Sequence, residues 1–178
     1  MSTIKFNLPT LLTFSRIILI PFFLVITPQS PLIGIGIFLI ATITDFLDGY
    51  LARRSGQITK FGIILDPIAD KFLVISALIL LVDMVLISVW IAVVIIVREF
   101  VVTGLRAVAL SKDIVIPADA GGKWKTAAQM TAIVLLLLPG GIGDLDFYDA
   151  GLVLIYISAV LAVVSGVRYT VQFWKKIQ

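Results

Sequence analysis

The chain has 178 residues, of which 60% are hydrophobic and only 14% are charged, and its mean hydropathy is +1.14. Soluble domains are about half apolar and about a quarter charged, so this composition excludes an ordinary soluble globular protein. The absence of cysteine and histidine excludes disulfides, zinc–thiolate and iron–sulfur sites, and a Ser–His triad. The net charge of +3 is expected to face anionic lipid headgroups rather than nucleic acid, because no soluble module remains to bind nucleic acid.

Six apolar stretches follow one another along the chain, separated by proline, glycine and charged residues. A membrane-spanning helix needs about 20 apolar residues, so six helices account for most of the length. The expected spans are residues 11–26, 32–50, 61–82, 85–110, 127–138 and 151–169. The fifth must be extended back through Lys123 to reach spanning length. The sequence therefore predicts an all-α integral membrane protein with six transmembrane helices, forming a single domain over residues 1–178.

Basic residues are distributed on one side of these spans, and Lys and Arg near span ends mark the cytoplasmic side. They gather before the first span, in the second and fourth connections and after the sixth span: Lys5, Arg53, Arg54, Lys60, Lys112, Lys123, Lys125, Lys175 and Lys176. The fifth connection instead carries Asp144, Asp146 and Asp149. We therefore expect a multi-pass protein of the cell (inner) membrane, with both termini cytoplasmic and the acidic loop outside.

Two features are expected at the membrane surface. Ahead of the first span, Ile4, Phe6 and Leu8 alternate with polar residues, which predicts either a short N-terminal interfacial segment or a frayed terminus. Aromatic residues near span ends are typical of interfacial belts, and we expect this position rather than a ligand site for four of them: Trp90, Trp124, Tyr169 and Trp174.

Four aspartates stand within the second and third spans, where an ionisable residue costs about 2.5 to 3.5 kcal/mol and by default marks function. Asp45 and Asp48 are three residues apart, and Asp66 and Asp70 are four apart, so each pair lies on one helical face. The short connection between the spans makes the two helices antiparallel neighbours. At a rise of about 1.5 Å per residue, all four carboxylates then reach one level in the cytoplasmic half of the membrane.

Carboxylates converging at low dielectric must be partly protonated or neutralised by divalent cations. All-oxygen ligands favour Mg²⁺ or Mn²⁺, and four carboxylates match the charge of two such ions, which could clamp a phosphoryl group. The alternative is that the aspartates only pair with basic residues near the headgroups, namely Arg53, Arg54, Lys60 and Lys71.

The same segment carries a longer motif, D-x2-D-G-x2-A-R-x8-G-x3-D-x3-D, which begins at Asp45 and ends at Asp70. It resembles, without departure, the signature of the CDP-alcohol phosphotransferases. The resemblance implies six membrane helices, a homodimer and a two-metal site, in which a CDP-linked lipid gives its phosphatidyl group to an alcohol and CMP is released.

By position, the resemblance makes Asp45, Asp48 and Asp66 metal ligands, and Asp70 both a ligand and the candidate base for the acceptor hydroxyl. It assigns a further set to binding of the CDP-lipid: Asn7, Thr13, Arg16, Gly49, Ala52, Arg53 and Gly62. For Arg16 an alternative stays open, since a long basic side chain can snorkel to the headgroups.

Three looser segments, residues 7–16, 97–106 and 122–129, resemble the bacterial phosphatidylglycerophosphate synthases, which implies CDP-diacylglycerol and sn-glycerol 3-phosphate as substrates. A dianionic acceptor phosphate needs Arg or Lys partners, and the candidates are Arg98, Arg106, Lys123 and Lys125. Alternatively, Arg98 pairs with a carboxylate such as Glu99, and the other three only anchor the cytoplasmic side.

Two rival functions also remain open at this point. The same chemistry could use another acceptor, namely inositol phosphate, serine or phosphatidylglycerol, and would then keep the carboxylate site. A divalent-cation carrier would use the same acids but would have no need of Arg53 and would release no CMP.

Overall fold

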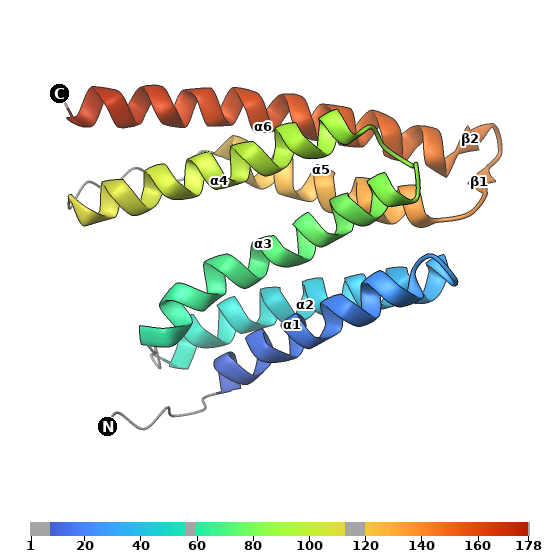
Figure 1. The fold of residues 1–178 in the computed structure, drawn as a ribbon, viewed down its shortest axis with the longest axis horizontal. Helices are drawn as coiled ribbons and strands as arrows, with labels where there is room; N and C mark the ends of the chain where they lie inside the picture. Colours follow the sequence, from blue (N-terminus) through green and yellow to red (C-terminus); the bar gives the residue numbers. More distant parts are fainter. Residues whose placement is uncertain (1–7, 56–59, 113–119, 178) are drawn as a thin grey trace. The chain divides into compact units, whose positions relative to one another are not determined.

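The computed structural model describes residues 8–55, 60–112 and 120–177, with side chains for residues 15, 17–44, 71–109, 111–112 and 124–176. This part of the chain is almost entirely helical (Figure 1). The helices are α1 (Leu8–Ile26), α2 (Pro31–Ser55), α3 (Lys60–Asp83), α4 (Val89–Ser111), α5 (Ala120–Leu137) and α6 (Phe147–Ile177). Two short antiparallel strands, β1 (Gly141–Ile142) and β2 (Leu145–Asp146), form a hairpin between α5 and α6.

Each predicted apolar stretch corresponds to one helix in the described residues, and α5 extends back to Ala120 as its length required. The helix α6 departs most from expectation, since it runs over Phe147–Ile177 instead of residues 151–169. A second difference lies between α3 and α4, because α4 begins at Val89 rather than at residue 85. Val85 adopts a left-handed conformation (φ 59°), and the N–H of Leu86 returns to the carbonyl of Leu81 at 2.8 Å. This closing turn satisfies a terminal carbonyl of α3 and separates the two helices.

The chain divides into two compact units, Met1–Leu80 and Leu81–Gln178. In the first unit, α1 packs against α2. The rings of Phe23 and Phe38 lie 5.7 Å apart between centroids, and both side chains are buried. Thr27 is also buried, and its hydroxyl donates to the carbonyl of Phe23 at 2.6 Å. Pro31 opens α2, a position where its missing N–H costs nothing.

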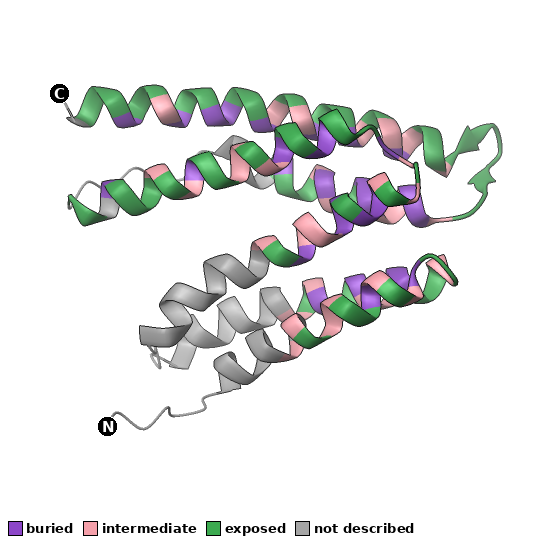
Figure 2. Ribbon diagram, in the orientation of Figure 1, coloured by how far each residue is buried: buried purple, intermediate pink, exposed green. Residues whose placement is uncertain are grey.

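In the second unit, α6 packs against both α4 and α5 (Figure 1). Its buried residues recur every three or four positions, which is the spacing of one helix face. They are Gly151, Ile155, Ser158, Ala162, Ser165, Gly166, Tyr169 and Phe173. The turns between them carry exposed apolar residues such as Val160 and Val167 (Figure 2).

Tyr169 is one of these buried residues, with 5% of its surface exposed. It belongs to a core cluster with Val102, Ala109 and Phe173. The prediction of an interfacial belt position for Tyr169 is therefore wrong, because its ring packs against α4 instead of facing outward. The three tryptophans, Trp90, Trp124 and Trp174, are exposed as a belt position requires.

Within the described residues, one helix, Phe147–Lys176, is long and apolar enough to cross a membrane, with a mean hydropathy of 2.4. Shorter apolar helices run over Ile17–Ile26, Pro31–Thr44 and Trp124–Leu137. The exposed residues of α4 and α6 include many large apolar side chains, whereas soluble monomers rarely expose contiguous apolar patches beyond a few hundred Å². These features agree with a membrane-associated protein.

Candidate functional site

The four aspartates of the signature lie in helical backbone, two in α2 and two in α3. Continuous helix keeps Asp45 with Asp48, and Asp66 with Asp70, on one face each. The side chains of all four lie outside the described residues. Among the side chains that the structure describes, no group of three or more His, Cys, Asp or Glu could hold a metal ion. The donor set itself, four carboxylates, has the chemistry that a hard divalent cation requires.

The CDP-lipid residues predicted from the sequence also fall outside the described side chains, and so does one of the acceptor candidates. They are Asn7, Thr13, Arg16, Gly49, Ala52, Arg53, Gly62 and Lys123. For Gly49, Ala52, Arg53 and Gly62 the backbone is helical, which preserves the spacing of the signature. The three acceptor candidates with described side chains, Arg98, Arg106 and Lys125, all belong to the second unit.

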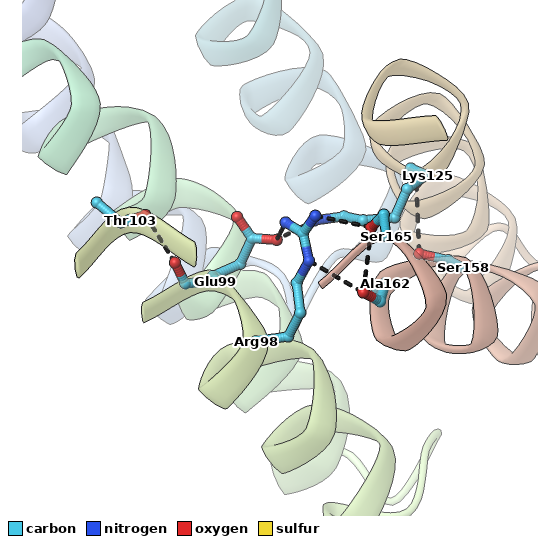
Figure 3. A network of polar contacts seen from close by, with 7 residues as sticks. All are labelled: Arg98, Glu99, Thr103, Lys125, Ser158, Ala162 and Ser165. Atoms are coloured by element: carbon cyan, nitrogen blue, oxygen red, sulfur yellow. Dashed lines mark hydrogen bonds and ion pairs between the residues drawn. The ribbon is translucent and has the colours of Figure 1, made fainter. Parts of the chain in front are cut away.

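Arg98 lies near the middle of α4 and reaches across to α6 (Figure 3). Its Nε donates to the carbonyl oxygen of Ala162 at 3.0 Å, and its Nη2 donates to the Ser165 hydroxyl at 2.7 Å. Its Nη1 donates to Glu99 Oε1 at 3.0 Å. Every nitrogen of the guanidinium thus has a protein partner, and the planar group fixes α4 to α6.

Glu99 joins this group to α5 (Figure 3). The ammonium of Lys125 donates to Glu99 Oε1, the same oxygen that accepts from Arg98. Lys125 is 4% exposed and the Glu99 side chain 17%, so this ion pair is largely buried. On the backbone side, the Ser158 hydroxyl donates to the carbonyl of Lys125 at 3.4 Å, which adds a contact between α5 and α6. One carboxylate therefore bridges two cations on neighbouring helices.

Small residues of α6 make room for the Arg98 side chain. A Cβ atom at Gly166 would lie 3.0 Å from Arg98 Cγ, tighter than ordinary van der Waals contact. The stem of Arg98 also lines an open apolar groove of about 480 Å³ between α4 and α6, whose other walls are mainly valines. The guanidinium of Arg98 is hydrogen-bonded to α6 while the residue also contributes to an apolar groove.

Arg106 lies two turns further along α4 and makes a different contact. Its guanidinium carbon lies 5.8 Å from the centre of the Tyr169 ring, within range of a cation–π interaction. Arg106 is exposed, whereas Arg98 and Lys125 are not. Of the acceptor candidates with described side chains, the structure thus brings Arg98 and Lys125 together through Glu99 and leaves Arg106 apart from them.

Three polar residues of this region were not predicted as site residues: Glu99, Ser165 and Gln129. The sequence alone could have indicated Glu99, because a carboxylate within an apolar span and next to Arg98 needs a charged or polar partner. The observed Arg98–Glu99 ion pair is the alternative contact that the sequence left open. Gln129 is 2% exposed, and among the described residues its Nε2 has no hydrogen-bond partner. It lies one helical turn after Lys125, on the same face of α5.

Comparison with known proteins shows the family of this chain and several similar proteins. The model of the family CDP-alcohol phosphatidyltransferase matches residues 6–164. A Bacillus subtilis (strain 168) protein named CDP-diacylglycerol--glycerol-3-phosphate 3-phosphatidyltransferase is 40% identical, over 97% of this chain and 98% of its own length. Proteins of the same name from Haemophilus influenzae and Escherichia coli (strain K12) are 42% and 40% identical, over 93% of this chain and 92% and 93% of their own lengths.

Proposed function

Because the chain belongs to the CDP-alcohol phosphatidyltransferase family, we propose that it transfers the phosphatidyl group of CDP-diacylglycerol to sn-glycerol 3-phosphate. The products are phosphatidylglycerophosphate and CMP, and the role is in phospholipid biosynthesis. The observation that carries this proposal is identity of 40% or more over at least 92% of both chains with relatives named for that reaction. The complete carboxylate signature in α2 and α3 supports the same chemistry.

We assign the reacting groups to the four signature aspartates. Asp45, Asp48, Asp66 and Asp70 would hold two divalent cations, Mg²⁺ or Mn²⁺, which when bound neutralise the charge of the diphosphate. The Asp70 carboxylate also takes the proton of the acceptor hydroxyl, whose oxygen forms the new bond to phosphorus while CMP leaves. Phosphoryl transfer depends on positioning and charge stabilisation more than on covalent help, so a chain without His or Cys can catalyse it.

Binding of the two substrates is divided between two groups of residues. The CDP-lipid is held by Asn7, Thr13, Arg16, Gly49, Ala52, Arg53 and Gly62. The acceptor phosphate is recognised by basic residues drawn from Arg98, Arg106, Lys123 and Lys125, because a half-buried dianion needs charge-assisted hydrogen bonds. The largely buried side chains of Arg98 and Lys125 support this choice, since ionisable residues within an apolar span by default mark function.

We further propose six spans with both termini cytoplasmic, an active site that opens to the cytoplasm, and a homodimer. The chain has no cysteine, so a single one can be introduced as a topology reporter. Asp144→Cys, in the exposed hairpin, should react with a membrane-impermeant maleimide from the outside of intact cells. Lys175→Cys, in the last turn of α6, should react only after the cells are opened. The reverse pattern would overturn the orientation.

The decisive test of the reaction is CMP release by the purified full chain with CDP-diacylglycerol and Mg²⁺ or Mn²⁺. Glycerol 3-phosphate is compared with inositol phosphate, serine and phosphatidylglycerol as the acceptor. We expect release with glycerol 3-phosphate and a product whose mass is that of phosphatidylglycerophosphate. Release with another acceptor alone would keep the carboxylate chemistry and overturn the acceptor. No release with any acceptor, in a folded preparation with metal, would contradict the transferase assignment.

A further inference from the structure

Among the described side chains at the centre of the second unit, two cations share one carboxylate. Arg98 and Lys125 are both positive, and both donate to the single carboxylate of Glu99. Each of the three side chains is at most 17% exposed. A buried charge is costly unless an opposite charge compensates for it. Two cations on one carboxylate, among the described side chains, favour binding of an anion at this network.

The two cations differ in how firmly they are held. Arg98 is fixed by contacts at all three nitrogens, two of them to α6, so turning it toward a ligand would break several hydrogen bonds at once. Lys125 donates to Glu99, and an ammonium has three donors on a flexible stem. Lys125 can therefore bind an incoming anion while it keeps its contact with Glu99.

We infer that Arg98 and Glu99 are positioning residues, and that they hold the ammonium of Lys125 in place for the phosphate of the acceptor. This inference rests on the proposed function, and it divides the basic residues between two tasks. Arg98 anchors Glu99 to α6, Glu99 fixes Lys125, and Lys125 makes the contact with phosphate. Glu99 thereby determines the affinity for a phosphate-bearing acceptor without touching it.

The side chain of Gln129 supports the presence of a ligand oxygen beside Lys125. Its buried Nε2 has no hydrogen-bond partner among the described residues, and buried polar groups are rarely left unsatisfied in native proteins. Because Gln129 follows Lys125 by one helical turn, the same face of α5 offers an ammonium and an amide donor. Acceptor oxygens of a small anionic substrate would satisfy both.

The first test is Glu99→Gln in the full chain, assayed for CMP release with each substrate varied in turn. The substitution keeps the shape of the side chain and removes the charge that holds Lys125. We expect the KM for glycerol 3-phosphate to rise about tenfold and the KM for CDP-diacylglycerol to change less than about twofold. Asp144→Asn removes an exposed carboxylate in the hairpin loop and should leave both KM values unchanged.

A double-mutant cycle separates positioning from general damage to the bundle. Lys125→Met alone should raise the KM for glycerol 3-phosphate at least as much as Glu99→Gln does. If Glu99 acts through Lys125, adding Glu99→Gln to Lys125→Met should raise this KM no further. Arg98→Lys should give a smaller rise of the same kind, because a lysine cannot reproduce the three-sided contact of the guanidinium.

The outcomes that overturn the inference are distinct from failure of the proposed function. An unchanged KM for glycerol 3-phosphate in Glu99→Gln would refute the positioning role. So would a rise of this KM on adding Glu99→Gln to Lys125→Met that equals its rise in the unaltered chain. If Glu99→Gln does not fold, Glu99→Asp keeps the charge one methylene shorter and should raise the KM about threefold; no rise would refute the role equally. Absence of CMP release by the unaltered protein would instead overturn the proposed function, and this inference with it.

Discussion

The α1–α2 pair and the α4–α5–α6 bundle are built from equally apolar helices but are held together by different contacts. Between α1 and α2, the described contacts include an aromatic pair, Phe23 with Phe38, and the close approach of Gly34 to Thr27. Between α4, α5 and α6, they include Arg98, Glu99 and Lys125 with their hydrogen bonds. In the described residues, the first seam is joined by packing contacts and the second by an ion-pair network.

The two seams differ in how their helices associate. In a lipid environment, helices associate through close packing and through hydrogen bonds worth about 1 kcal/mol each. Among the described residues of α1 and α2, close packing makes the contact. The ionisable groups of the second seam agree with the proposed recognition of an anionic acceptor.

Metal removal should have the largest effect, and it acts on the carboxylates of α2 and α3 rather than on the bundle. Chelation by EDTA should reduce CMP release to background, because uncompensated carboxylates repel a diphosphate. Added Mg²⁺ or Mn²⁺ should restore CMP release. The temperature at which the α4–α5–α6 bundle unfolds should depend little on metal. Full activity after exhaustive chelation would contradict the two-metal proposal.

Asp70→Asn should have the next largest effect, on turnover instead of binding. Loss of a general base costs about 100-fold or more, and loss of a metal ligand adds to this. We expect kcat to fall by at least about 100-fold while the protein stays folded. Asp83→Asn, at the exposed end of the same helix, is the matched control and should retain activity. Near-normal turnover in Asp70→Asn would rule out its role as base.

How much the sequence could predict differs between these regions. The helices were predictable because apolar length and breaks at Pro, Gly and charge are local signals. The aspartate motif is recognised from residue type and spacing alone, and its role as a metal site stays a prediction. In the network, the Arg98–Glu99 pair was one of the alternatives that the sequence left open. The contacts of Arg98 with Ala162 and Ser165 were not predictable, because they lie more than sixty positions along the chain and no local pattern encodes them.

Tyr169 and the hairpin illustrate the same limit in the fold. An aromatic residue near a span end has the same sequence signal whether it faces lipid or a neighbouring helix, and only the packing against α4 decides that Tyr169 is buried. The β1–β2 hairpin has two residues in each strand, too few for an alternating pattern. Positive φ angles at Gly140 and Gly143 allow the turns that close it.

Close packing between α1 and α2 can be tested with two glycines of α2 that differ in their surroundings. A Cβ atom at Gly34 would lie 2.7 Å from the Cβ of Thr27, whereas one at Gly36 meets nothing within 4 Å. Both changes to Ala should gain the same helix propensity. Gly34→Ala should nevertheless unfold more readily in detergent than Gly36→Ala, by about 1 to 3 kcal/mol, because the seam must open. Equal stabilities would show that close packing does not hold α1 to α2.

The corresponding pair in the bundle should give the smallest effect, since a side chain there can yield. A Cβ atom at Gly166 would lie 3.0 Å from Arg98 Cγ, and one at Gly104 meets nothing within 4 Å. Because Arg98 can shift its stem by a few tenths of an ångström, Gly166→Ala should be less stable than Gly104→Ala by only about 1 kcal/mol. The shift should loosen the hold on Glu99, and so raise the KM for glycerol 3-phosphate about twofold in Gly166→Ala alone. If both variants keep the same KM for glycerol 3-phosphate, the position of Arg98 does not control acceptor binding. The α4–α6 contact would then have only a structural role, as the α1–α2 contact does.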